Sequence, residues 1–199
     1  MRGRVLSSGC LVVAGLLCLQ VACAPKGQPA SNQPIEIGVS APLTGSLAVW
    51  GNNTLRGIQL AADEVNAAGG VSGRKIELVV EDSRCEPEEA VKILRSFIEA
   101  RHIQVVLGAD CSADVLAMAP VAQDKQVVLF STGASNPEIS HAGDFVFRNW
   151  PSDALQGRLT ARYARDIGGF RRAAILYVDN AYGQGLDDVF RREFEAMGW

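Results

Sequence analysis

Short strand-forming runs alternate with amphipathic helical stretches from residue 35 to residue 199, where the sequence stops. The runs are rich in β-branched residues and lie at Ile35–Ser40, Lys75–Asp82, Ile103–Gly108, Val127–Ser131, Phe145–Asn149 and Ala173–Val178. Several are apolar almost throughout, which is typical of strands that are covered on both faces. The stretches between them carry apolar residues at helical spacing. This alternation predicts an α/β fold with a parallel sheet.

Helix boundaries can also be predicted from the proline, serine and glycine residues that favour helix ends. Pro87 and Ser152 lie where helices are expected to begin, and Gly69–Gly70 and Gly168–Gly169 lie where two of them are expected to end. Right-handed crossovers of this repeated kind give a doubly wound sheet with its ligand site at the carboxyl ends of the strands. The loops that follow the strands are therefore the candidate binding loops.

The composition excludes several classes of protein. Hydrophobic residues make up 48% of the chain and charged residues 21%, which is ordinary for a globular protein and unlike a disordered chain. The formal net charge is -3, and no block of Lys or Arg follows the pattern that binds a phosphate backbone. Nucleic acid is not expected as a partner.

The first 34 residues are expected to direct export. Arg2 and Arg4 precede an apolar run over Leu11–Val21, which is the order of a secretory signal and is too short to span a bilayer comfortably. The run Leu19–Cys23 resembles the bacterial lipobox, in which cleavage leaves a lipidated cysteine, although Gln20 departs from that pattern. We expect a signal at 1–22, lipidation at Cys23 and a flexible tether over 23–34. Cleavage near Ala22 or Ala24 without lipid, and an uncleaved anchor, are the alternatives.

No catalytic or cofactor motif is found. Gly183-Gln184-Gly185 follows a strand, but Asp188 stands where a dinucleotide fingerprint needs its third glycine, and no Walker sequence exists. Pro137 stands where a nucleophile elbow needs its second glycine. The two histidines, His102 and His141, are far apart, so a zinc site is not expected. The sequence predicts no cofactor, no metal and no enzyme.

Five short strings, in register with the predicted strand ends, resemble the leucine/isoleucine/valine-binding proteins. These are solute-binding subunits of ABC importers with the type I periplasmic fold. The strings are Ile37–Gly45 with the following Trp50-Gly51, Gly57 and Asn66–Gly73, then Glu81–Ser83 with Cys85–Pro87, Gly108–Ser112, Ser131–Glu138 and Asp179–Gly185. The resemblance covers residues 35–199 in order.

The resemblance implies a division into two lobes. Family members are longer than this chain, so the sequence is expected to be an N-terminal fragment. Residues 35–149 would form most of the first lobe, and residues 150–199 would begin the second. The protein is then expected outside the cytoplasm, in the periplasm or on the outer face of the cell membrane, where it would deliver its ligand to a membrane permease.

The resemblance also implies a binding site on the strand ends. Ser112 and Ser135 would hold the carboxylate of an amino acid, and the carbonyl group of Gly133 would accept from the ammonium group, with Ala134 in the same loop. The acidic partner of the ammonium group is expected after Trp199. The alternatives are that Ser112 only caps a helix and that Gly133–Asn136 is an ordinary turn.

Two aromatic residues complete the expected site. Trp50 and Tyr182 stand in loops after strands, and they would close over the ligand from opposite lobes. Their alternative is packing within the loops. Trp150 and Trp199, by contrast, are expected in the core or the hinge.

Two cysteines, Cys85 and Cys111, remain in the folded part, each three residues after a predicted strand. An exported chain with this content suggests one disulfide, and the resemblance implies a bridge between these loops. The alternative is two free buried thiols.

For function, a solute receptor of an importer is favoured over a sensor of the same fold that reports to a regulator. It is also favoured over an α/β enzyme whose chemistry the sequence does not show.

Overall fold

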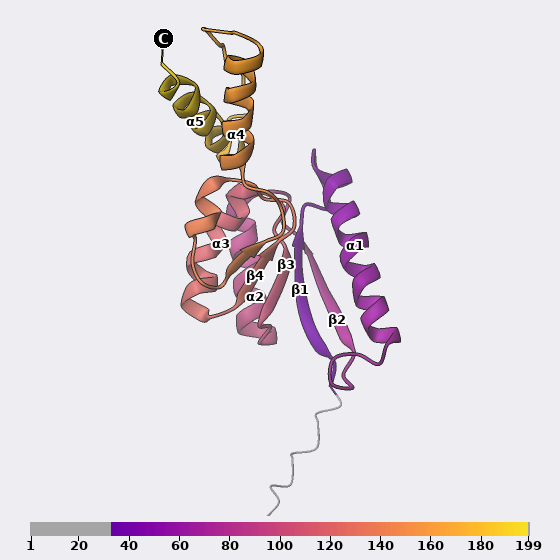
Figure 1. Ribbon diagram of the computed structural model, residues 1–199. Helices are drawn as coiled ribbons and strands as arrows, with labels where there is room; N and C mark the ends of the chain where they lie inside the picture. Colours follow the sequence, from indigo (N-terminus) through magenta and orange to yellow (C-terminus); the bar gives the residue numbers. More distant parts are fainter. Residues whose placement is uncertain (1–32, 199) are drawn as a thin grey trace, which may run out of the picture. The chain divides into compact units, whose positions relative to one another are not determined.

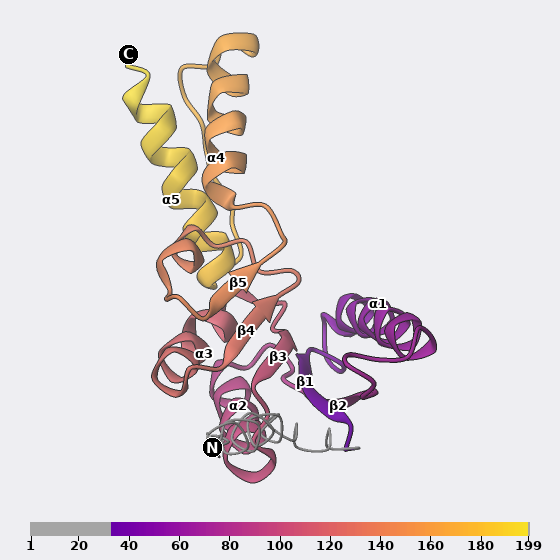
Figure 2. The same ribbon diagram turned by 60° about the horizontal axis from the view of Figure 1, so that its bottom comes forward.

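A computed structural model describes residues 33–198 of the chain. Five parallel strands form one sheet in the order β2-β1-β3-β4-β5 (Figures 1 and 2). The strands are β1 (Ile35–Ala41), β2 (Ile76–Asp82), β3 (Val105–Gly108), β4 (Val128–Ser131) and β5 (Val146–Arg148). Each begins within two residues of the run predicted from the sequence. The α/β fold with a parallel sheet is therefore confirmed.

Helices cover both faces of the sheet, as a doubly wound fold requires. The chain runs from β1 through α1 (Ala48–Ala67) to β2, then through α2 (Pro87–Arg101) to β3 and through α3 (Ser112–Lys125) to β4. In Figures 1 and 2, α1 lies on one side of the sheet, while α2 and α3 lie on the other. The strand order changes direction between β1 and β3, so the loops that follow these two strands flank the switch point.

The helix ends agree with those predicted from the proline, serine and glycine residues. Pro87 is the first residue of α2, and the hydroxyl of Ser152 caps α4 (Asp153–Arg162) by accepting from the backbone N–H of Ala154. Helix α1 ends at Ala67, and Gly69 and Gly70 follow with φ of 104° and 77°. Glycine adopts this left-handed region without steric cost, so the chain can turn back toward β2.

The hydrophobic core lies between the sheet and the pair α2 and α3. Its largest fully buried side chains are Leu94, Phe97, Ile103, Met118 and Leu129. The ring of Phe97 lies against Gly38 of β1, where an added Cβ would come within 2.6 Å of the ring. The short segment η1 (Pro137–His141) covers one end of this core through Ile139. Burial of this set fixes the sheet on which the loops stand.

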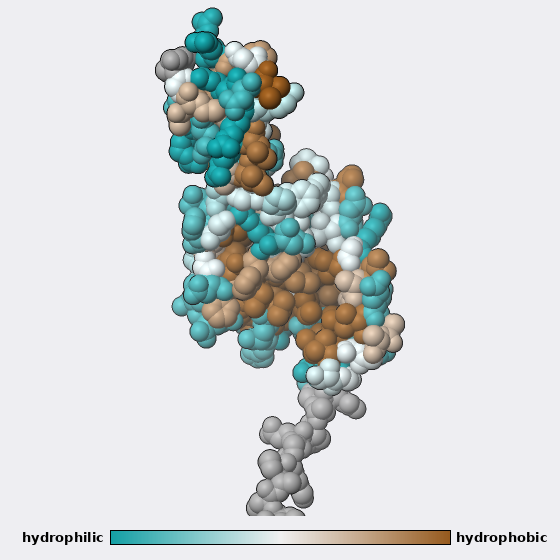
Figure 3. Space-filling model, in the orientation of Figure 1, coloured by the Kyte–Doolittle hydropathy of each residue, from teal (hydrophilic) through white to brown (hydrophobic). Residues whose placement is uncertain are grey.

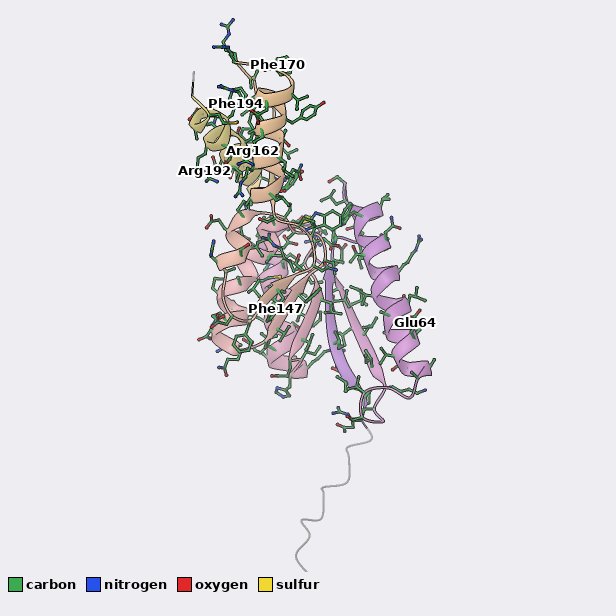
Figure 4. The ribbon with its side chains drawn as sticks, in the orientation of Figure 1. Glu64, Phe147, Arg162, Phe170, Arg192 and Phe194 are labelled. Atoms are coloured by element: carbon green, nitrogen blue, oxygen red, sulfur yellow. A yellow bond between two sulfur atoms is a disulfide. The ribbon has the colours of Figure 1, made fainter. Side chains whose placement is uncertain are left out.

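The opposite face of the sheet is only partly covered. Helix α1 and the strands enclose an apolar cavity of about 400 Å³, lined by Ile37, Ile58, Leu78, Leu107 and Phe130 among others. Figure 3 shows a wide hydrophobic surface over the sheet beside this helix. Phe147 of β5, which Figure 4 labels on the sheet, is 47% exposed.

The remaining residues form a helical pair. Helix α4 continues into one π-helical turn, η2 (Tyr163–Ile167), and α5 (Ala181–Ala196) packs against α4. Phe190 and Phe194 of α5 stack with their ring centres 5.5 Å apart, and the guanidinium of Arg165 lies over the Phe194 ring. The contact of Arg165 with Phe194 joins η2 to α5.

The prediction of a strand at 173–178 is wrong. This segment has no strand assignment, and no strand among residues 33–198 pairs with it. Leu176 is fully exposed and Val178 is 63% exposed. A single extended segment needs hydrogen bonds from a neighbouring strand to become part of a sheet, and an apolar pattern alone does not supply them.

The predicted export signal, the lipidation site Cys23, the tether up to residue 32 and Trp199 lie outside the described residues. Within residues 33–198, no helix has the length and apolar content needed to cross a membrane.

Candidate ligand-binding site

A cavity of about 620 Å³ lies at the carboxyl ends of the strands. Most of the residues expected to bind ligand line it: Trp50, Ser112, Gly133, Ser135 and Tyr182. Ala134 is not among them, because it is buried below the loop, where its N–H donates to the hydroxyl of Ser131. The cavity therefore brings together residues of α1, α3 and α5 and of the loop after β4, at the switch point where doubly wound folds bind ligands. Trp50 and Tyr182 are expected in loops from the sequence, but they lie in the first turns of α1 and α5.

Gly133 forms the floor beneath the indole of Trp50. A Cβ atom added to Gly133 would lie 3.0 Å from Nε1 of Trp50 and 3.2 Å from Oδ1 of Asp110. A side chain at this position would displace both neighbours. Glycine thus leaves the backbone of the loop after β4 open to a ligand.

Ser112 does not cap its own helix, so the alternative interpretation as an N-cap is wrong. Cys111 is the N-cap of α3, and Ser112 is the first helical residue. The hydroxyl oxygen of Ser112 accepts from the backbone N–H of Asn136 over 3.2 Å. A hydroxyl that accepts one hydrogen bond still has its own proton to donate. Ser112 can therefore donate to an anion at the positive end of α3.

Ser135 is oriented differently from Ser112. Its hydroxyl donates to Oδ2 of Asp153 over 2.8 Å, and its carbonyl accepts from the N–H of Asp153 over 2.9 Å. Burial raises the pKa of Asp153, while the hydrogen bond from Ser135 and the charge of Arg148 oppose that rise. Because the Ser135 proton is already used, this hydroxyl offers a ligand only an acceptor.

Asp110 also lines the cavity, although no sequence pattern pointed to it. Its Oδ1 accepts from the hydroxyl of Thr132, and only 7% of the residue is exposed. Burial raises the pKa of Asp110, and the hydroxyls of Thr132 and of the nearby Thr54 in α1 partly offset this rise. Asp110 therefore joins the loop after β3 to the loop after β4, while its Oδ2 is buried without a hydrogen bond of normal geometry among the described residues.

Asp82, the last residue of β2, holds the loop that leads to Trp50. Its Oδ1 accepts from the N–H groups of Leu43 and Arg84, and its Oδ2 accepts from the hydroxyl of Thr44. Desolvation is the largest single influence on its pKa and raises it, but the hydrogen bonds together outweigh desolvation and lower the pKa. The charged form of Asp82 thus orders the start of α1.

Trp150 is not a core residue, one of the two places expected for it from the sequence. It is 44% exposed and lines the same cavity. Its ring centre is 5.5 Å from that of Trp50, and the two ring planes meet at 77°. No periodic pattern marks a single loop residue, so the sequence offered no signal for this contact.

Residues at the start of α5 form another wall of the cavity. Tyr182 is 42% exposed in the first turn of α5, and Asn180 caps that helix by accepting from the N–H of Gly183. The side-chain amide of Asn136 donates to the carbonyl of Ala181 over 2.6 Å. Asn136 therefore connects the loop that contains Ser135 to the helix that carries Tyr182, a link that no sequence pattern indicated.

A disulfide joins Cys85 and Cys111 in the structure, with their Cα atoms 5.7 Å apart. This separation is within the usual range for a bridge. Cys85, Cys111 and Asp114 also form the one group of ligand-type atoms in residues 33–198 with a metal-like spacing. The two sulfur atoms are bonded to each other, so neither is a thiolate that could bind a metal.

Asp114, the third residue of α3, is fully buried beside this bridge. Neither carboxylate oxygen has a hydrogen bond of normal geometry within the described residues. Burial raises its pKa to about 6, the nearby hydroxyl of Ser83 lowers it, and the charges of Asp110 and Glu86 raise it further. The first turn of α3, which presents Ser112 to the cavity, thus contains a buried carboxyl group without a cationic partner.

With this geometry established, comparison with known proteins places the chain in a family. The periplasmic binding protein family matches residues 34–199, so the chain belongs to this family. It is 30% identical over 185 residues to an amino acid binding protein of Pseudomonas aeruginosa, a match that covers 92% of this chain and 50% of the relative. It is also 30% identical over 176 residues to the leucine-specific-binding protein of Salmonella typhimurium, covering 88% and 46%. The chain spans about half the length of these relatives.

Solved structures agree with the fold. The leucine-binding protein LivK of Thermotoga maritima superposes with a TM-score of 0.75 at 30% identity, covering 82% of this chain and 46% of that one. The substrate-binding protein LivJ of Streptococcus pneumoniae, solved with isoleucine, gives a TM-score of 0.73 at 30% identity, covering 81% and 47%. The relatives are solute-binding proteins, which supports a non-enzymatic interpretation.

Proposed function

We propose that this chain forms part of an extracytoplasmic receptor that binds an amino acid and delivers it to an ABC permease. The single observation that carries the proposal is the cavity at the strand ends, with Ser112 free to donate at the positive end of α3. A relative named for leucine binding and a solved branched-chain amino acid binding protein in complex with isoleucine support the ligand class.

The polar groups can be assigned to the two charged ends of an amino acid. Ser112 and the N–H groups of the first turn of α3 would hold the carboxylate. The Gly133 carbonyl and the hydroxyl oxygen of Ser135 would accept from the ammonium group. In this assignment Ser135 accepts from the ammonium group, whereas the sequence led us to expect that it holds the carboxylate. The reason is that the Ser135 hydroxyl already donates a hydrogen bond to Asp153.

We propose that residues 35–149 belong to one lobe and that residues 150–199 begin the other. Trp50 and Tyr182 would then lie on the two sides of the ligand, and closure of the lobes around it would create the surface that a permease recognises. The link between Asn136 and Ala181 would be one of the contacts retained across the hinge.

The proposal for Ser112 is tested with Ser112→Ala in the protein translated from the complete gene. Loss of one hydrogen bond to a charged carboxylate, worth about 1.5–3 kcal/mol, should weaken amino-acid binding roughly 10- to 100-fold in calorimetry. Ser96→Ala, at an exposed position on α2, is the matched control and should bind as the wild type does. Unchanged affinity in Ser112→Ala would mean that the site is placed wrongly.

We also propose that Cys23 carries lipid and holds the receptor at the membrane. Mass spectrometry of the exported protein should then find a lipid-modified N-terminal Cys23, and Cys23→Ser should release the protein into the soluble fraction. An unmodified N-terminus after Ala22 or further along the chain would contradict this assignment.

A further inference from the structure

Three partly exposed aromatic residues line the cavity. Trp50, Trp150 and Tyr182 line it and are 45%, 44% and 42% exposed. Aromatic side chains contribute large areas to binding, and a group of exposed ones around a single cavity marks a contact surface. The three aromatic residues come from α1, from the loop after β5 and from α5, so the surface encloses the cavity from several directions.

The two tryptophans form a corner. Their planes meet at 77° with centroids 5.5 Å apart, so the edge of one ring points toward the face of the other. Gly133 lies close to Nε1 of Trp50, so the corner stands beside the loop that presents the polar groups. A flat ring that enters this corner can meet one indole face to face and the other edge to face. These are the two arrangements that aromatic pairs prefer.

From this geometry, and building on the proposed function, we infer that Trp150 is a specificity-determining residue that selects amino acids with a flat aromatic side chain over branched aliphatic ones. A branched aliphatic side chain gains burial in the corner but none of the directional contact between rings. The preference depends on Trp150, because Trp50 alone offers a single surface and no corner.

The test compares L-phenylalanine with L-leucine by calorimetry in the protein translated from the complete gene. The wild type should bind phenylalanine more tightly than leucine. Trp150→Leu keeps apolar bulk but removes the ring, so phenylalanine affinity should fall about three- to tenfold while leucine affinity stays within about twofold. Phe147→Leu is the matched control, because Phe147 is also about half exposed but lies on the sheet, outside this cavity (Figure 4).

The outcomes separate this inference from the proposed function. The aromatic preference is overturned if the wild type binds leucine more tightly than phenylalanine, or if Trp150→Leu lowers both affinities equally. Either result leaves the proposed function as an amino-acid receptor standing. Absence of binding by both ligands and by every other amino acid overturns the proposed function, and the inference with it. Circular dichroism of each variant confirms that the affinities refer to folded protein.

Discussion

Replacing Cys85 and Cys111 with serine should lower the free energy of unfolding by roughly 3.5 kcal/mol. The bridge closes a loop with a sequence separation of 26 residues, and the chain-entropy estimate for a loop of this length gives a stabilisation of about that size. Cys111 directly precedes α3, and the bridge ties it to Cys85 in the loop after β2, so loss of the bridge should loosen the helix end that presents Ser112. Urea unfolding of wild type and variant measures the first effect, and ligand affinity measures the second.

The two single variants give the control for this prediction. If the sulfur atoms are bonded, Cys85→Ser and Cys111→Ser should each lose most of the stability that the double variant loses, since either change breaks the same bridge. Peptide mapping without reductant should find the two cysteines in one linked peptide pair. Alkylation of both thiols in the folded, unreduced protein would contradict the bridge.

Asp114→Asn should stabilise the protein at pH 8 by about 3 kcal/mol. The folded-state pKa of Asp114 is raised to about 6 from an ordinary value of 3.8, so its charged form destabilises the fold above pH 6. As the pH falls from about 6 to about 4, the carboxyl group takes up a proton in the folded state and the penalty disappears. The advantage of the Asp114→Asn variant over the wild type should therefore shrink across the same interval.

The pH dependence isolates the charge of Asp114. A constant difference in packing between the two side chains shifts every measurement equally, whereas the ionisation penalty varies with pH. Urea unfolding at several pH values between 4 and 8 provides the comparison, with Asp63→Asn at an exposed position of α1 as the control for removing one negative charge. A stability difference that stays flat over this range would show that Asp114 is not a buried acid with a raised pKa.

The sheet could be predicted because its signals are local. Buried parallel strands are apolar throughout, and Pro87, Ser152 and the paired glycines mark helix boundaries within a few residues. The loops that follow the strands could be placed together for the same reason, since parallel strands end at one edge of the sheet. The segment at 173–178 has the same apolar pattern but forms no strand, because a strand also needs a neighbouring strand to pair with.

The details of the site depend on contacts between residues far apart in the sequence. Trp50 and Trp150 are separated by 100 positions, and Ser135 donates a hydrogen bond to Asp153 of α4. Residue type predicts that a serine can donate a hydrogen bond, but only packing decides which acceptor receives it. Asp110 was missed because a lone acid after a strand resembles any loop residue until Thr132 and Thr54 are placed around it.

The exposed segment at 173–178 also bears on how this chain behaves at high concentration. Its sequence, Ala-Ala-Ile-Leu-Tyr-Val, has no charge and no proline, and its backbone has no ladder partner among residues 33–198. Such a segment can pair with the same segment of another molecule, which is how edge strands initiate aggregation. Arg171 and Arg172 lie directly before the segment, and we expect the repulsion between these charges on neighbouring copies to oppose such pairing.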